Sequence, residues 1–239
     1  NADQCTIEAG GQVTVNSGQT WTIADGAGTD LTVNGDVVNS GTMTMTGAAV
    51  FNSGSLYEHA LNGGTIPTAT WNTSSTCQIT GTTNSDPSGD DQAFGNLTYN
   101  CTGMTGNRNM ANSGLSIAGN FQVLNTGSGQ LRMRQTPVTV TGNCTISDNF
   151  RIGDGTPRTL NVNGNFSLND GTLDMSSGNN IADIGTLNIL GDFSLTGGTL
   201  TKTGINGSGS VIFNGSGTPQ TYTSGGTISN TINFTVNSS

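Results

Sequence analysis

The residues best suited to chemistry begin with a group of aspartates. The densest acidic segment reads NSDPSGDDQ and contains Asp86, Asp90 and Asp91. Glycoside hydrolysis needs two carboxylates placed across the bond that breaks, and calcium is held by carboxylate oxygens. Neighbouring side chains on an extended chain point to opposite faces, so Asp90 and Asp91 should diverge. The segment is predicted to be a solvated loop, with a calcium site formed by the three aspartates as the alternative, and catalysis is not expected.

A second group consists of arginines, all five of which lie between residues 108 and 158. The planar guanidinium fork matches a carboxylate or a sulfate. Arg132, Arg134 and Arg151 are therefore a candidate strip for acidic glycans. The alternative is an ion pair between Arg151 and Asp174, worth about 0 to 1 kcal/mol if it is exposed.

The single histidine, His59, follows Tyr57 and Glu58 and could act as a general base. No motif places a nucleophile or a glycine-rich oxyanion loop beside it, so a histidine at the surface or at a junction between coils is expected. The sequence therefore predicts a protein that is not an enzyme and has no cofactor, unless the aspartates hold calcium.

Four cysteines are present, and no pair has the CxxC spacing of a zinc site. Cys77 and Cys101 fall in one irregular segment and are the candidate disulfide. Cys144 occupies a position where sister repeats have Phe or Val, which predicts a buried apolar side chain. Low charge and many Asn, Thr, Ser and Gly residues favour an extracellular or cell-surface location, where a disulfide would persist.

Composition argues against two classes of partner. The chain has 239 residues, 15 acidic against 6 basic ones and a net charge of −9, which argues against binding nucleic acid. No apolar run approaches the roughly 18 residues of a membrane-spanning helix, so membrane insertion is not expected. Only 31% of the residues are hydrophobic while 37 are glycine, so the core must be thin.

A repeated pattern organises the chain. It reads LSIAGNFQVLNTGSGQLRM from 115, VTVTGNCTISDNFRI from 138, LNVNGNFSLNDGTLDM from 160 and LNILGDFSLTGGTLTK from 187, with a related copy, LTVNGDVVNSGTMTM, from 31. These starts from 115 onward lie 22 to 27 residues apart, which is typical of one coil of a solenoid. We therefore predict an all-β fold, a right-handed parallel β-helix (β-solenoid) with about three short strands per coil.

Within the copy that starts at 160, the alternation predicts which side chains point inward. Gly164 and Gly171 lie at the corners between strands, where a positive φ costs glycine little. The inward residues are predicted to be Leu160, Val162, Phe166, Leu168, Leu173 and Met175.

The whole chain, residues 1–239, is predicted to be one solenoid module and a fragment of a longer repetitive protein. Less regular coils are expected near 69–103 and 211–239, because these two segments resemble each other and break the repeat.

Stacking the copies in register predicts two outward columns. The third strands give Arg132, Arg151, Asp174 and Thr201, and the first strands give Thr32, Ser116, Thr139, Asn161 and Asn188. Since the second column does not keep threonine from coil to coil, it would match an ice lattice poorly.

The core phrase LxVxGNFxL, with FGNLTYN from 94 and FNGSGTPQTYT from 213, resembles the repeats of large secreted bacterial surface proteins built as parallel β-helices. The similarity is to adhesin passenger regions, especially the repeat proteins that Bacteroidota-type bacteria export by the type IX pathway. It implies a non-enzymatic structural stalk or adhesin segment, with surface glycans or further coils of the same protein as partners. A carbohydrate-binding or polysaccharide-processing β-helix is the alternative, and an ice-binding solenoid is a minor one.

Overall fold

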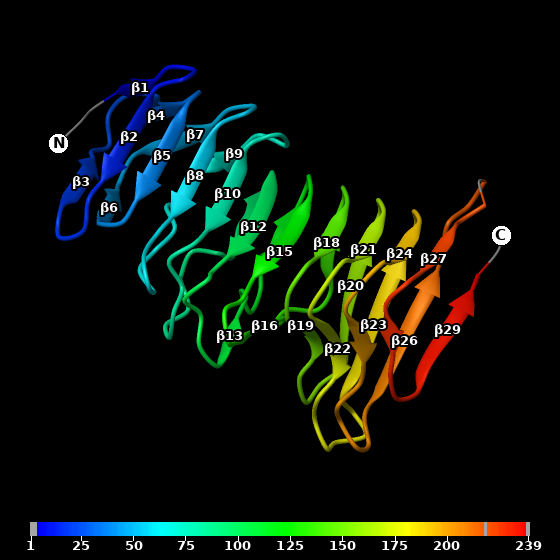
Figure 1. Ribbon diagram of the computed structural model, residues 1–239. Coiled ribbons are helices and arrows are strands. Elements are labelled where there is room, and N and C mark those ends of the chain that lie inside the picture. The colour runs from blue at the N-terminus through cyan, green and yellow to red at the C-terminus, as the bar shows by residue number, and fades with distance from the viewer. Residues whose placement is uncertain (1–3, 218, 238–239) are drawn as a thin grey trace.

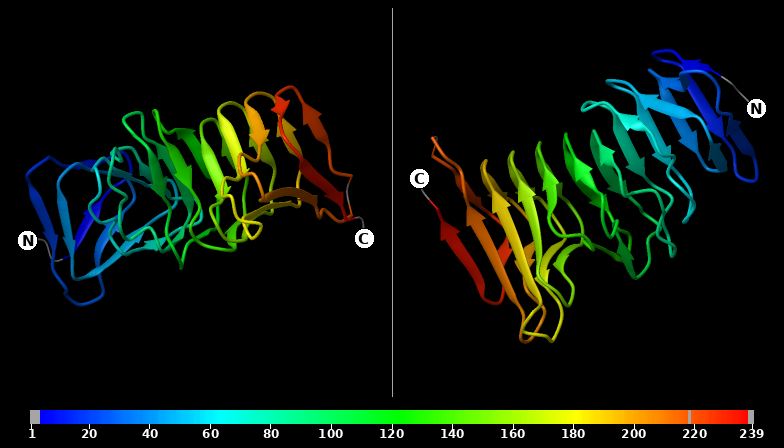
Figure 2. Two further views of the ribbon diagram at one scale, coloured as in Figure 1. Left: turned by 90° about the horizontal axis from the view of Figure 1, so that it is seen from below. Right: turned by 180° about the vertical axis from the view of Figure 1, so that it is seen from behind.

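The fold is a stack of parallel β-coils, which confirms the predicted solenoid (Figure 1). The computed structural model describes residues 4–217 and 219–237. This part of the chain forms 29 strands, and each ladder between neighbouring coils is parallel. None of the described residues forms a helix long and apolar enough to span a bilayer. Figure 2 shows the same stack from below and from behind, with the termini at opposite ends.

The longest sheet contains ten strands, one from each of about ten coils, and runs the length of the stack. It is the face on which the strands of all coils pair without a break. Its strands, in spatial order, are β2 (Gln12–Val15), β5 (Asp36–Asn39), β8 (Leu56–His59), β10 (Thr76–Ile79), β12 (Asn96–Asn100), β15 (Phe121–Asn125), β18 (Cys144–Ile146), β21 (Phe166–Leu168), β24 (Phe193–Leu195) and β27 (Tyr222–Ser224).

A second face consists of a four-stranded and a seven-stranded sheet, which adjoin where β9 contacts β11. The first sheet contains β1 (Cys5–Ile7), β4 (Thr29–Val33), β7 (Ala48–Phe51) and β9 (Thr70–Trp71). The second contains β11 (Ala93–Phe94), β14 (Ser116–Ile117), β17 (Val138–Val140), β20 (Arg158–Val162), β23 (Ile184–Ile189), β26 (Ser208–Phe213) and β29 (Ile232–Val236).

The third face is interrupted, and the interruption creates the candidate site described below. Two strands, β3 (Thr20–Ile23) and β6 (Thr42–Met45), form one part of it. Loops at residues 60–69 and 80–92 then replace the third strand of two coils. The face resumes with β13 (Asn107–Asn109), β16 (Gln130–Arg132), β19 (Phe150–Gly153), β22 (Thr172–Ser176), β25 (Thr199–Thr201) and β28 (Thr227–Ile228).

The core is a set of side-chain columns along the stack. The six residues predicted to point inward from the copy at 160 are confirmed, since each is at most 1% exposed. On the ten-stranded sheet, strand register places one inward residue above the next. That column runs Val13, Val37, Tyr57, Cys77, Leu97, Phe121, Cys144, Phe166, Phe193, Tyr222. Its two end members are not buried: Val13 is partly exposed and Tyr222 is 43% exposed.

The repeated Gly-Asn phrase forms a ladder at the corner before the second strand of each coil. The Oδ1 atom of Asn120 accepts the backbone N–H of Asn143 at 2.9 Å, and Oδ1 of Asn143 accepts that of Asn165 at 2.8 Å. Oδ1 of Asn165 then accepts the N–H of Asp192 at 2.8 Å. Each asparagine thus satisfies a backbone donor of the following coil that would otherwise lack a partner at the turn.

Glycine is needed beside this ladder for space rather than for a positive φ. Gly171 has a φ of +67°, as expected, but Gly164 is not among the residues with positive φ, so that part of the prediction is wrong. A Cβ on Gly164 would lie 2.5 Å from the carbonyl oxygen of Gly142 in the preceding coil. The close backbone approach, and not the dihedral angle, excludes a side chain there.

Replacing Gly164 with alanine is expected to lower the free energy of unfolding by about 1–3 kcal/mol, because the backbones of two coils must move apart. Chemical denaturation of the purified chain measures the change. Gly103→Ala is the control, because its Cβ would meet only the side-chain methyl of Thr83, at 3.2 Å. Equal losses in the two variants would contradict the close-approach explanation.

Candidate functional site

The predicted charge column exists on the six-stranded sheet, but two of its four members, Asp174 and Thr201, are buried rather than outward. Arg132 pairs in register with Arg151, Arg151 with Asp174, and Asp174 with Thr201. The alternation and the repeat length were therefore sufficient to place four side chains from four coils in one line.

Arg132, Arg134 and Arg151 form a charged cluster around Asp154, a residue that the sequence did not single out. Asp154 accepts a hydrogen bond from Nη1 of Arg134 at 2.6 Å and lies 3.3 Å from Nη1 of Arg132. Its other oxygen lies 3.5 Å from Nη1 of Arg151. Asp154 directly follows β19, one residue beyond the strand that carries Arg151, and this position was the available signal.

Asp174 makes the predicted pair with Arg151, but it does so in the interior. The two side chains approach to 3.6 Å, and Asp174 is 2% exposed. Its carboxylate also accepts the hydroxyl of Thr203 at 2.6 Å and the N–H of Thr203 at 3.0 Å. Burial raises the pKa of Asp174, while the bonds from Thr203 and the charge of Arg151 act in the opposite direction.

These contacts leave little of the arginine charge for a ligand. Burial lowers the pKa of Arg132, partly offset by Asp154. Arg132, Arg134 and Arg151 together face two aspartates, so three positive charges meet two negative ones and one remains. The side chains are 20%, 35% and 15% exposed. An acidic-glycan strip at these three arginines remains a proposal, and the geometry favours a mainly structural cluster.

Replacing Asp154 with asparagine is expected to lower the free energy of unfolding by about 1–3 kcal/mol, because three partly buried guanidinium groups would repel one another. The loss should shrink as NaCl is raised, since salt screens the repulsion. Thermal and urea unfolding at low and high salt measure both effects. Asp25→Asn, at an exposed position, changes the net charge equally and is the control. A salt-independent loss would contradict this explanation.

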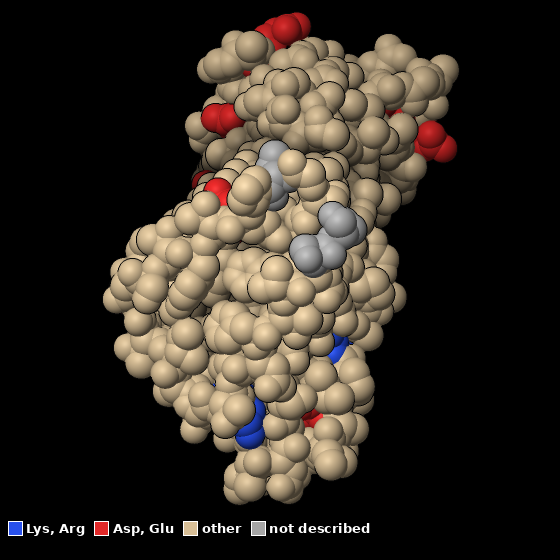
Figure 3. All heavy atoms as spheres, turned by 90° about the vertical axis from the view of Figure 1, so that its right-hand side faces the viewer, with Lys and Arg blue, Asp and Glu red and all other residues tan. Residues whose placement is uncertain are grey.

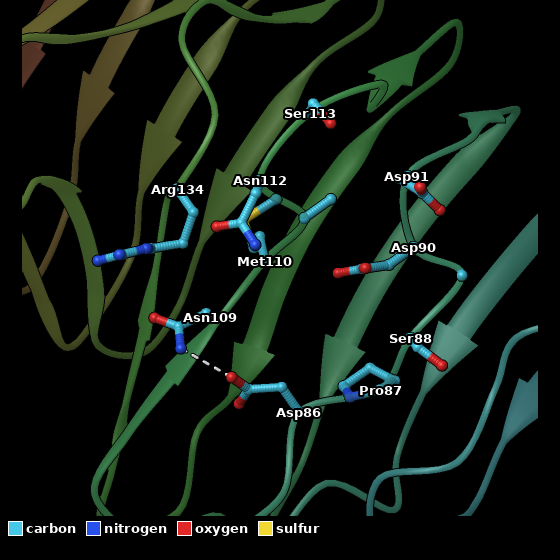
Figure 4. A pocket seen from close by; sticks show the side chains of 12 residues that line it. Asp86, Pro87, Ser88, Asp90, Asp91, Asn109, Met110, Asn112, Ser113 and Arg134 are labelled. Atoms are coloured by element: carbon cyan, nitrogen blue, oxygen red, sulfur yellow. Dashed lines mark hydrogen bonds between the residues drawn. The ribbon is translucent and has the colours of Figure 1, made fainter.

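The acidic segment lines a groove on the interrupted face (Figure 4). This groove has a volume of about 460 Å³ and lies between residues 86–91 of one coil and 109–113 of the next. Nδ2 of Asn109 donates to Asp86 at 2.7 Å, and Nη1 of Arg108 lies 3.7 Å from the same carboxylate. Asp86 is thus held by the neighbouring coil rather than extended into solvent.

The three aspartates do not converge. Figure 4 shows the carboxylate of Asp90 projecting into the groove and that of Asp91 pointing elsewhere, as the alternation predicts. Over residues 4–217 and 219–237, no three His, Cys, Asp or Glu side chains are grouped so that they could hold a metal ion. The structure therefore does not assemble the predicted calcium site from Asp86, Asp90 and Asp91.

The predicted disulfide between Cys77 and Cys101 is wrong, since all four cysteines are free. Cys77 pairs in register with Leu97 of the next coil, and Cys101 lies four positions further along the chain. Four strand positions correspond to about 13 Å, whereas bridged Cα atoms lie about 4.4–6.8 Å apart. Cys144 is fully buried, as expected.

His59 lies at a coil junction, at the end of β8, but it is fully buried rather than at the surface. Its Nε2 lies 2.7 Å from the carbonyl oxygen of Gly63, so Nε2 carries the proton. Its Nδ1 then accepts the hydroxyl of Tyr57 at 3.2 Å, and that hydroxyl accepts Nδ2 of Asn39 at 3.0 Å. Burial lowers the pKa of His59, and the network is satisfied by the neutral ring. No nucleophile takes part in it, so a general base is not supported.

Comparison of the chain with protein-family models, with curated protein sequences and with solved structures finds no match. The resemblance to secreted bacterial surface repeats therefore remains an expectation from the sequence, and the structure shows the β-solenoid fold alone.

Proposed function

We propose that the chain is a non-enzymatic structural segment, a stalk or adhesin segment of an exported cell-surface protein. The observation that carries this proposal is the unbroken ladder of ten parallel strands from β2 to β27. Ten coils at the parallel spacing extend about 45 Å, so adding coils lengthens the molecule without changing its cross-section.

The surface supports the same role. Charged residues make up 9% of the chain, and the face in Figure 3 shows them as isolated spots among neutral side chains. Large single-sign fields attract unrelated macromolecules, and this face has none. A sparsely charged face suits a segment that separates two functional parts.

A carbohydrate-binding or polysaccharide-processing role is the second candidate. It is favoured by the groove between residues 86–91 and 109–113, where polar side chains from neighbouring coils converge. The ice-binding alternative has less support, because the column on the first strands does not keep threonine: Thr139 pairs with Asn161, and Asn161 pairs with Asn188.

Antibody labelling of intact cells of the source organism tests the location. Antibodies raised against the purified chain should label unbroken cells, and external protease should remove the label. Labelling that appears only after lysis would contradict the proposal. Incubating the chain with a polysaccharide panel should release no reducing ends, whereas sustained release would favour the processing alternative.

A further inference from the structure

The groove beside the acidic segment has the dimensions of a small-ligand site. Its volume of about 460 Å³ lies within the roughly 300–1,000 Å³ typical of such sites. It exists because the loop at 80–92 replaces a strand, so that two successive coils face each other across a gap instead of pairing.

Asp90 gives this groove a group that lacks a partner. The residue is 6% exposed, and its Oδ2 has no hydrogen-bond partner among the residues that the structure describes. The carboxylate projects into the groove in Figure 4. A buried acceptor without a donor is costly, so this oxygen must be satisfied by water or by a ligand.

The titration of Asp90 reflects the same environment. Burial, followed by the charges of Asp91 and Asp86, raises its pKa from 3.8 to about 6. The backbone N–H groups of Asp90 and Ala111 lower the pKa of Asp90, but by less than burial and the neighbouring charges raise it. At neutral pH the groove therefore contains an ionised oxygen that needs a donor.

The surroundings exclude several classes of ligand. An anion would meet the charges of Asp86, Asp90 and Asp91, while the guanidinium of Arg134 is turned away from the groove toward Asp154. A calcium ion needs about six to eight oxygens, and Asp90 and Asp91 diverge. A purely apolar ligand would leave Oδ2 of Asp90 unsatisfied.

We propose that this groove binds a neutral polyhydroxylated ligand, one sugar unit of a glycan, whose hydroxyl groups donate to the Asp90 carboxylate. Asn112 and Ser113, both exposed on the opposite wall, offer donors and acceptors to further hydroxyl groups. The inference rests on the carbohydrate-binding candidate and names its site, and it is independent of the stalk proposal.

Amide chemical shifts of the ¹⁵N-labelled full chain test it. D-glucose, D-galactose, D-mannose and N-acetyl-D-glucosamine are each titrated to about 50 mM, which detects dissociation constants in the millimolar range. At least one should shift amides within 86–91 and 109–113. Asp90→Asn should weaken that sugar about tenfold or more, because it removes a charged acceptor. Asn112→Ala, at an exposed position, should weaken it several-fold.

The control is Asp25→Asn, which removes one carboxylate far from the groove in sequence and should leave the affinity unchanged. Absence of any shift in these segments would overturn the proposal, as would tighter binding of sodium glucuronate than of glucose. Shifts caused by calcium chloride but by no sugar would replace the sugar with a cation. Sugar-induced shifts elsewhere, insensitive to Asp90→Asn, would overturn this site while leaving carbohydrate binding in place.

Discussion

Replacing Phe166 with alanine is expected to lower the free energy of unfolding by about 3–5 kcal/mol. Phe166 is 0% exposed and lies in register between Cys144 and Phe193. Its ring centroid is 5.5 Å from that of Phe193. Because the core is only one coil wide, few side chains can move into the cavity that the truncation leaves.

Urea unfolding followed by circular dichroism measures this loss. Ser167→Ala changes the adjacent residue, which is partly exposed on the other face of β21, and should cost less than about 0.5 kcal/mol. A loss below about 1 kcal/mol for Phe166→Ala would mean that the column is not close-packed.

The same variant should show how stability is distributed along the stack. In a solenoid each coil contacts mainly its neighbours. The substitution is therefore expected to promote local unfolding of the adjacent coils before the whole chain unfolds. Hydrogen exchange should accelerate first in β21 and β24, and later in β5 and β8. Uniform acceleration in all coils would indicate a single cooperative unit instead.

The fold was accessible from the sequence because two periodicities agree. Alternation every second residue places Phe166 and Leu168 on one face, and the repeat length stacks them on Phe193 and Leu195. The two rules together fix the strands, the parallel pairing and the column of Arg132, Arg151 and Asp174.

The same alternation could have placed His59 correctly. Tyr57 and His59 are two positions apart and therefore share a face, and Tyr57 lies in the inward column. The expectation of a histidine at the surface or at a coil junction did not use this pattern, and only the junction part of it is confirmed. The buried network with Asn39 depends on side-chain geometry that no spacing rule contains.

The conformations of the turns between coils could not be predicted from the sequence either. Asp154 and the groove around Asp90 depend on how loops close between coils, and loop conformation is not periodic. The pairing of Cys77 with Cys101 failed for a related reason, because closeness in sequence within an irregular coil does not imply closeness in register. Elements that recur could be predicted, and elements that interrupt the recurrence could not.

Asp90 lies in the loop that interrupts the third face. Replacing it with asparagine is expected to raise the free energy of unfolding of the ligand-free chain at neutral pH by up to about 3 kcal/mol. The pKa of Asp90 is raised from 3.8 to about 6, so the folded chain holds this proton more tightly than the unfolded chain does. The resulting stabilisation is fully present below pH 3.8 and is lost as pH rises through about 6. Asparagine keeps the shape without the charge, so the variant should not show this decline.

Free energies of unfolding of both proteins at intervals between about pH 4 and pH 8 measure the difference. The depressed pKa of His59 changes stability in the opposite direction, with loss on acidification, but it is common to both proteins and cancels in the comparison. The difference should grow from pH 4 to pH 6 and then level off. Replacing a residue with a purely structural role lowers the free energy of unfolding of the protein. Replacing a binding residue that is held in an unfavourable environment raises it. Loss of stability in Asp90→Asn at pH 7 would therefore contradict both the titration and the assignment of Asp90 to a ligand.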